Sequence, residues 1–246
     1  MILIVPMAGR GLRFAEHGMQ TPKPLIPVAG RPMFAWALQS LNAIPRSRLI
    51  FIALKEHEQF FGLKNLLNEN VIEPYNLVLL DAVTEGQLCT VFAARPWLET
   101  DESVLVASAD TYVQSSLAND IRSQPADCHG LISVAEMPGE RWSFARTNNE
   151  GWVVEVAEKV RISGHASTGL YYFSSGRELL EIGDEMISQQ EKTHDEYYII
   201  PVYQKYIQRG WKVGISKSKE MWDMGTPEAL NAFERYLQKN KDLRSR

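Results

Sequence analysis

The chain has 246 residues, of which 45% are hydrophobic and 23% are charged, so it can bury a full core as one large α/β domain, with or without an appendage. Its formal net charge of −4 argues against a general nucleic-acid binder, whose surface is normally basic. Two cysteines without a CxxC pair form no disulfide framework, which fits a reducing compartment. No apolar run approaches the about 20 residues that a membrane span requires, so we expect a soluble, cytoplasmic protein with no membrane partner.

The first half of the sequence alternates buried strands with helices. Continuous apolar runs with β-branched members predict strands, and apolar residues at helical spacing predict helices. The predicted strands are 1–5, 49–54, 77–80 and 104–107, and the predicted helices are 33–44, 58–70 and 86–95. This alternation favours a mostly parallel sheet with helices on both faces.

The second half has a different pattern, because short strand-like segments follow one another without helices between them. They are 130–136, 142–146, 152–157 and 167–173, and we expect an antiparallel or mixed section that covers the open end of the sheet. Helices at 177–190 and 196–209, a strand at 212–216 and a helix at 227–239 complete the prediction. Thr226 at the N-cap and Pro227 at the first helical position are typical of a helix start.

Two glycines follow the first strand in the segment Gly9-Arg10-Gly11-Leu12-Arg13. A glycine-rich turn at a strand end can offer backbone N–H groups to an anion, and this spacing matches neither a P-loop nor the dinucleotide fingerprint. Further along, Lys23 lies between Pro22 and Pro24, which restrict the backbone and fix the position of the cation. A glycine turn alone is usually only a turn, but the combination predicts a triphosphate site.

Two aspartates follow predicted strands. Asp110 comes after 104–107, and Asp223 lies between the last strand and the last helix. Each of them alone is more often a cap or turn residue. Beside a triphosphate loop they match Mg²⁺, which proteins hold through one or two carboxylates plus substrate phosphates. We therefore predict that Asp110 and Asp223 are metal ligands.

These motifs resemble the sugar-1-phosphate nucleotidylyltransferases (NDP-sugar pyrophosphorylases). Residues 6–14 and 22–33 match that family's N-terminal signature, in which a GxGxR turn precedes PKP[LM]-x-P-[VI]-x-[GN]-x-P-[ML]. The family also has an Asp after its fourth strand, a Glu-Lys pair before Thr-Gly-[ILV]-Tyr-x-[FY], and a second Asp before Gly-Thr-Pro-Glu. The corresponding residues here are Asp110, Glu158-Lys159 with 168–173, and Asp223. Five motifs in order cover nearly the whole chain.

The resemblance implies a three-layer α/β/α, Rossmann-like mixed sheet, mostly parallel, of the nucleotide-diphospho-sugar transferase type. It implies a single domain over 1–246, with a nucleotide-binding part at about 1–112, a sugar-binding part at about 113–226 and the C-terminal helix 227–239. The implied reaction is Mg²⁺-dependent: an NTP and a sugar 1-phosphate give an NDP-sugar and pyrophosphate, as a precursor of capsule, lipopolysaccharide or a related glycan.

The resemblance also implies a role for each site residue. Arg13 and Lys23 would be catalytic, and Asp110 and Asp223 would hold the metal. The implied nucleotide-binding residues are Ala8, Gly9, Arg10, Gly11, Asp81 and Gly86, the last two in a loop that faces the base. The implied sugar-phosphate-binding residues are Ser143, Glu158, Lys159, Thr168 and Gly169. Leu12 and Ser143 depart from the commoner pattern, which leaves the sugar unidentified.

Three other functions stay open on the sequence. A cytidylyltransferase that acts on an alcohol or amino-alcohol phosphate would share the glycine turn and the lysine. A non-catalytic domain of the same fold would be expected to lose Lys23 or an aspartate, and a glycosyltransferase would favour a DxD motif, which residues 110–112 do not form. The aromatic segment 196–198 could line a sugar pocket, although burial in the core is the better expectation. The sequence identifies neither the base nor the oligomeric state, so a homo-oligomer stays open.

Overall fold

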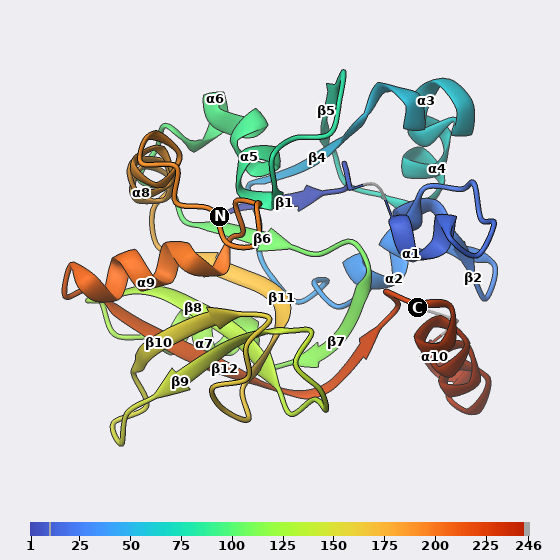
Figure 1. Cartoon of the computed structure of the whole chain (residues 1–246). Coiled ribbons are helices and arrows are strands. Elements are labelled where there is room, and N and C mark those ends of the chain that lie inside the picture. The colour runs from blue at the N-terminus through green and yellow to red at the C-terminus, as the bar shows by residue number, and fades with distance from the viewer. Residues whose placement is uncertain (10, 244–246) are drawn as a thin grey trace.

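A mixed β-sheet crosses the molecule and carries helices on both faces (Figure 1). The computed structural model describes residues 1–9 and 11–243, without the side chains of Leu12, Arg13 and Lys241. The predicted nucleotide-binding Arg10 therefore lies outside the described residues, as does the side chain of the predicted catalytic Arg13.

The strands of the main sheet are β1 (Ile2–Pro6), β4 (Arg48–Leu54), β5 (Asn76–Leu80), β6 (Val104–Ala107), β7 (Thr111–Ser115), β8 (Cys128–Ala135), β9 (Ser143–Thr147), β10 (Val153–Glu158), β11 (Ala166–Phe173) and β12 (Lys212–Asp223). Their order is β5-β4-β1-β6-β11-β8-β12-β7, and the β9–β10 pair is joined through β11. The β5-β4-β1-β6 section is parallel, whereas β11 is antiparallel to both of its neighbours. The predicted mixed sheet is thus confirmed. A separate short pair consists of β2 (Pro27–Val28) and β3 (Arg31–Pro32).

The helices are α1 (Leu12–Ala15), α2 (Met33–Gln39), α3 (Lys55–Phe61), α4 (Leu63–Asn70), α5 (Gln87–Val91), α6 (Arg95–Leu98), α7 (Leu117–Ser123), α8 (Gly176–Ser188), α9 (Ile200–Gln208) and α10 (Pro227–Lys239). Short 3₁₀ turns are η1 (Lys23–Leu25), η2 (Phe92–Ala94) and η3 (Lys241–Leu243). None of these helices in the described part of the chain is long and apolar enough to cross a bilayer.

Alternate residues of the parallel strands enter two different cores, because successive side chains of a strand point to opposite faces. Ile2 and Ile4 of β1 belong to a cluster with α5, α6, α8 and α9. Leu3 and Val5 belong to the opposite cluster, with α2, α4 and α7. Burial on both faces explains why these strands are continuous apolar runs in the sequence.

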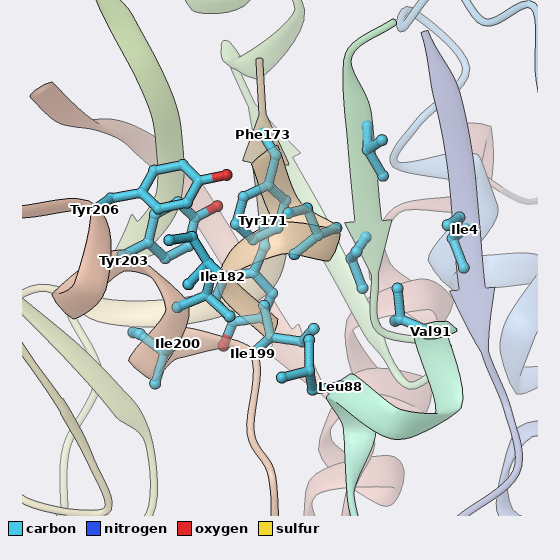
Figure 2. Close-up of a cluster of buried hydrophobic side chains, with 14 of the residues drawn as sticks. Ile4, Leu88, Val91, Tyr171, Phe173, Ile182, Ile199, Ile200, Tyr203 and Tyr206 are labelled. Atoms are coloured by element: carbon cyan, nitrogen blue, oxygen red, sulfur yellow. The ribbon is translucent and has the colours of Figure 1, made fainter. Parts of the chain in front are cut away.

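The first cluster is rich in aromatic rings (Figure 2). Tyr203 of α9 stacks on Phe173 of β11 with 4.7 Å between ring centroids, and its hydroxyl donates to the carbonyl of Tyr172 at 2.8 Å. Such ring pairs add about 0.5–1.5 kcal/mol to the free energy of burial. The packing holds α9 on β11, and with it the chain segment that leads into α9.

A third, smaller cluster attaches α10 to the rest of the fold. Phe233 packs edge-on against Trp36 of α2 at 5.7 Å between ring centroids and lies over Tyr112 at 5.3 Å. The predicted N-cap is confirmed, since the Thr226 hydroxyl accepts from the Ala229 N–H at 3.2 Å. This packing fixes the turn between β12 and α10, which carries Asp223.

Several predicted helices differ from the observed ones for local reasons. Gly62 adopts a left-handed conformation with φ 62° and divides the predicted 58–70 helix into α3 and α4. The predicted helix 86–95 is instead α5, η2 and α6, and Pro96 lies in the first turn of α6, where its missing N–H costs no bond. The predicted 196–209 helix begins only at Ile200, because 191–198 forms an irregular turn.

Next to the site, one strand was not predicted and another is longer than predicted. β7 follows Asp110 directly, and β12 continues to Asp223 rather than ending at Ser216. The two strands pair antiparallel, with Asp223 opposite Thr111. The pairing of two half-buried strands has no strong signal in either strand alone, because tertiary contacts decide it.

Candidate active site

A cleft of about 690 Å³ opens where the chain leaves the carboxyl ends of β1, β5 and β6. This edge is the usual ligand position in open α/β sheets. The cleft brings together six of the predicted residues, which are Ala8, Gly9, Gly11, Lys23, Gly86 and Asp110. Asp195, Glu196, Tyr198 and Gly225 also line the cleft.

The two predicted metal ligands are neighbours because β12 pairs with β7. Asp223 stands opposite Thr111, and the N–H of Met224 donates to the carbonyl of Asp110 at 2.8 Å. The Lys23 ammonium donates to Asp110 Oδ2, and both side chains are about a quarter exposed or less. The turn after β6, the end of β12 and η1 therefore meet at one point.

The electrostatics of the two carboxylates differ. Burial by itself raises the pKa of Asp110, but the charge and hydrogen bond of Lys23, with a bond from the Thr111 hydroxyl, outweigh it and hold that pKa below its ordinary value. Burial, and next the negative charge of Asp110, raise the pKa of Asp223 against the opposing charges of Lys23 and Arg141. The two acids thus repel each other across a small space.

This acid pair fits a hard divalent cation. Among the described residues no group of three or more His, Cys, Asp or Glu could hold a metal alone. Two carboxylates with mutual repulsion supply oxygen ligands of the kind that Mg²⁺ takes together with substrate phosphates. Asp110 and Asp223 are the residues that could hold it.

Two glycines let the chain approach this point closely. Gly11 has φ +60°, and a Cβ there would lie 3.0 Å from Lys23 Cβ. A Cβ on Gly225 would lie 2.7 Å from Asp223 Oδ1 and 3.2 Å from Lys23 Nζ. The Gly225 N–H also donates to Asp223 Oδ1 at 3.0 Å. Larger residues at these positions would displace the lysine or the aspartate.

Arg141 is a functional candidate that sequence reasoning missed. Its guanidinium donates to Asp223 Oδ2 at 2.7 Å and stacks over Trp142 at 4.3 Å from the ring centroid. Arg141 precedes β9 and reaches Asp223 through the fold, not through any local motif. No spacing in the sequence indicates this contact.

The loop after β5 enters the cleft at Gly86. Its φ of +144° is unfavourable for other residues, and a Cβ would lie 2.5 Å from the N and O atoms of Tyr197. The Thr84 hydroxyl donates to the Gly86 carbonyl at 2.9 Å and stiffens the loop. Asp81 lies elsewhere: it is exposed, pairs with Lys55 at 2.6 Å and is not part of the cleft lining. Its predicted nucleotide contact stays a prediction.

The predicted sugar-phosphate residues Glu158 and Lys159 lie at the end of β10. Lys159 Nζ donates to the Tyr198 hydroxyl at 2.5 Å, and Tyr198 lines the cleft. Glu158 is buried and accepts from the Ser143 hydroxyl, to which Tyr171 donates at 3.3 Å. Burial raises the pKa of Glu158, although Ser143 and Lys159 oppose the shift.

Thr168 and Gly169 lie on β11, next to the end of β6. The Thr168 hydroxyl is buried and donates to Ser133 Oγ at 2.7 Å, so its side chain serves the sheet. Gly169 has φ +81°, and a Cβ there would collide with Ser108, whose N–H donates to the Gly169 carbonyl at 2.9 Å. Neither Thr168 nor Gly169 lines the cleft, but the Gly169 backbone is bonded to Ser108, which does.

The fold and the cleft define an α/β protein with a glycine turn, a lysine and an acid pair at one sheet edge. Residues 2–240 match the family model of the nucleotidyl transferases. The chain belongs to this family. The predicted family and enzyme class are thereby confirmed.

Solved structures and curated proteins agree with this assignment. The nucleoside-diphosphate-sugar pyrophosphorylase of Vibrio cholerae RC9 is 26% identical, with a TM-score of 0.81 over 95% of this chain and 99% of that one. The inositol-1-phosphate CTP transferase of T. maritima, at 16% identity and a TM-score of 0.76 over 97% of this chain and 95% of that one, shows the fold alone.

Among curated proteins, the bifunctional protein GlmU of Burkholderia ambifaria is 22% identical over 98% of this chain and 52% of its own length. The chain therefore spans about half the length of the curated relatives that it matches.

Proposed function

We propose that this protein condenses an NTP with a sugar 1-phosphate to give an NDP-sugar and pyrophosphate. The observation that carries the proposal is the ion pair of Lys23 and Asp110 in the lining of the cleft that Gly9 and Gly11 also line. Asp223 is not part of that lining, but it lies next to the pair, opposite Thr111 and bonded to the cleft-lining Gly225. One cation and two carboxylates beside the backbone of a glycine turn suit a nucleotide tail with its metal.

The nucleotide phosphates would lie along the glycine turn, with Lys23 and Arg13 on the α-phosphate and the leaving pyrophosphate. Asp110 and Asp223 would hold Mg²⁺, which when bound neutralises phosphate charge and orients the displacement. Gly86 would allow the loop after β5 to approach the base. Arg10 and Asp81 keep their proposed nucleotide contacts.

The proposed reaction requires that the two substrates are positioned and their charges stabilised, and it requires no proton transfer. An oxygen of the acceptor phosphate forms a bond to the α-phosphorus, and the bond from that phosphorus to the bridging oxygen of pyrophosphate breaks. A phosphate monoester is already ionised at neutral pH, so no general base is required. Fixed charges that act on the transferring group supply the rate enhancement.

The acceptor would lie toward the end of β10. Lys159 would hold its phosphate, Glu158 with Ser143 would accept sugar hydroxyls, and the backbone at Thr168–Gly169 would close on the ring. Residues 1–246 would act as one domain in the cytoplasm, in the supply of a glycan precursor.

A second candidate is a cytidylyltransferase that acts on an amino-alcohol phosphate. Asp195 and Glu196 line the cleft near Tyr198, and carboxylates at this end would attract a cationic acceptor. They would bind a neutral sugar only through hydrogen bonds.

The test is pyrophosphate release over the common NTPs against sugar 1-phosphates, choline phosphate and ethanolamine phosphate, with and without Mg²⁺. Turnover with a sugar 1-phosphate supports the first proposal. Turnover with only the amino-alcohol phosphates replaces it by the second, and no pyrophosphate with any pair would contradict both.

A further inference from the structure

The turn between α8 and α9, drawn in orange in Figure 1, contributes Asp195, Glu196 and Tyr198 to the lining of the cleft. Thr193 and Glu196 exchange backbone hydrogen bonds at 2.9 and 3.1 Å, and His194 and Asp195 between them have φ of 49° and 63°. Left-handed residues other than glycine persist where the surrounding structure fixes them, and they gather at functional sites. We refer to residues 193–198 as the cleft turn.

One side of the cleft turn is fixed to the loop after β5. The Tyr197 N–H donates to the Glu85 carbonyl at 2.9 Å, and the Leu88 N–H donates to the Tyr197 carbonyl at 2.9 Å. Gly86 lies so close to the Tyr197 backbone that no Cβ fits between them. The Tyr197 side chain is buried, so this side of the turn belongs to the core.

The other side of the turn holds Lys159. The Tyr198 hydroxyl accepts from Lys159 Nζ at 2.5 Å, and the ammonium lies 4.8 Å from the centroid of the same ring. Lys159 has φ +54°, so the backbone turns at this residue after β10. A lysine has three N–H donors. Tyr198, which lines the cleft, takes one of them. Lys159 lies behind that lining, and its ammonium makes no other hydrogen bond to the described residues.

We propose that Tyr198 is a positioning residue that holds the Lys159 ammonium at the acceptor end of the cleft, and that the cleft turn couples this position to the loop after β5. The inference rests on the proposed function for its kinetic consequences. A lysine side chain is flexible and loses entropy when it is fixed on a phosphate. Tyr198 places it before the acceptor arrives, and an ordered loop after β5 is needed to place Tyr198.

The first test compares Tyr198→Phe with Tyr75→Phe, which removes a hydroxyl bonded to Asn68 on a different part of the surface. A hydrogen bond to a charged group corresponds to about a tenfold change or more. We expect kcat/KM for the acceptor to fall about tenfold in Tyr198→Phe, with KM for the NTP unchanged and Tyr75→Phe like wild type. No change, or equal losses for both substrates, would overturn the proposal.

A double variant tests whether Tyr198→Phe lowers kcat/KM for the acceptor by way of Lys159. In a Lys159→Met background, Tyr198→Phe should cost nothing further, because no ammonium remains to be positioned. Independent, multiplying losses would show that Tyr198 acts by another route and would overturn the positioning role.

A third readout does not depend on turnover. Acylation of lysines by an amine-reactive reagent, followed by mass spectrometry, measures how accessible each ammonium is. Lys159 should react several-fold faster in Tyr198→Phe, and also in Gly86→Ala, because a Cβ on residue 86 would lie 2.5 Å from the Tyr197 backbone and displace the turn. Exposed Lys64 on α4 serves as the internal control. Unchanged labelling of Lys159 in folded Tyr198→Phe overturns the contact, and unchanged labelling in folded Gly86→Ala overturns the coupling. If the wild type releases no pyrophosphate with any substrate pair, the proposed function fails while labelling still decides this inference.

Discussion

Lys23→Met is the sharpest perturbation of the candidate site, because it removes the charge and keeps most of the side-chain volume. The Lys23 ammonium is bonded to Asp110. It also lies close to Gly225, since a Cβ added to Gly225 would be 3.2 Å from Lys23 Nζ. In the proposed reaction it acts on the nucleotide phosphates. The variant should therefore change both the reaction rate and the stability of the protein.

The two effects can be separated by size. Loss of one preorganised donor to a developing charge costs about 10²–10³ in kcat, or about 2.7–4 kcal/mol. A hydrogen bond between charged groups contributes about 1.5–3 kcal/mol, and the Lys23 and Asp110 side chains are 21% and 26% exposed, so solvent screening reduces this to about 1–2 kcal/mol. For a chain of this length that lowers Tm by about 2–8 °C.

The assay is initial-rate pyrophosphate release at saturating substrates, with thermal unfolding of the same samples. Lys64→Met on the exposed face of α4 is the matched control and should behave as wild type. A folded Lys23→Met protein with kcat within twofold of wild type would remove Lys23 from the catalytic machinery and refute the reasoning.

Three further outcomes are expected. Gly86→Ala forces a Cβ to 2.5 Å from the Tyr197 backbone, so the free energy of unfolding should fall by about 1–3 kcal/mol; an unchanged Tm would contradict the packing. Burial raises the pKa of Glu158 in the folded state. The contribution of Glu158 to the free energy of unfolding is therefore complete at a pH below its pKa in the unfolded chain, and it is lost as the pH rises through its pKa in the folded protein. Glu158→Gln, which can still accept from Ser143, should therefore raise Tm at pH 7–8 and not near pH 4, and a pH-independent difference would count against burial as the cause. Removal of divalent ions with EDTA should abolish turnover and Mg²⁺ should restore it, whereas full turnover in EDTA would contradict a role for the acid pair in holding a metal.

The parallel half of the fold was predictable because strands buried on both faces are uninterrupted apolar runs, as in β1 and β4. The sequence predicted Asp110 and Asp223 from two separate motifs, but not how the two side chains are arranged. That arrangement depends on β12 continuing to Asp223 and pairing with β7, which neither segment indicates by itself.

Arg141 and Tyr198 show why part of the site escaped prediction. Arg141 reaches Asp223 from the segment before β9, and nothing local to its sequence requires that contact. The aromatic segment 196–198 has mixed roles, since Tyr197 is buried in the core and Tyr198 lines the cleft. The two residues are of the same type, so the sequence does not distinguish them, and the course of the backbone in the turn decides which side chain is buried. The family resemblance implied that Asp81 lies in a loop that faces the base. The structure pairs Asp81 with Lys55 outside the cleft lining, and its nucleotide contact stays a prediction.

The central claim is that the glycine turn, Lys23 and the two aspartates converge on one nucleotide tail. A crystal structure with an NTP analogue whose α,β-bridging oxygen is replaced by methylene, together with Mg²⁺, tests it most directly. We expect the triphosphate against the backbone of Gly9 and Gly11 and on Lys23, with the cation between Asp110 and Asp223. A nucleotide bound away from these five residues, or a cation that contacts neither aspartate, would contradict the account.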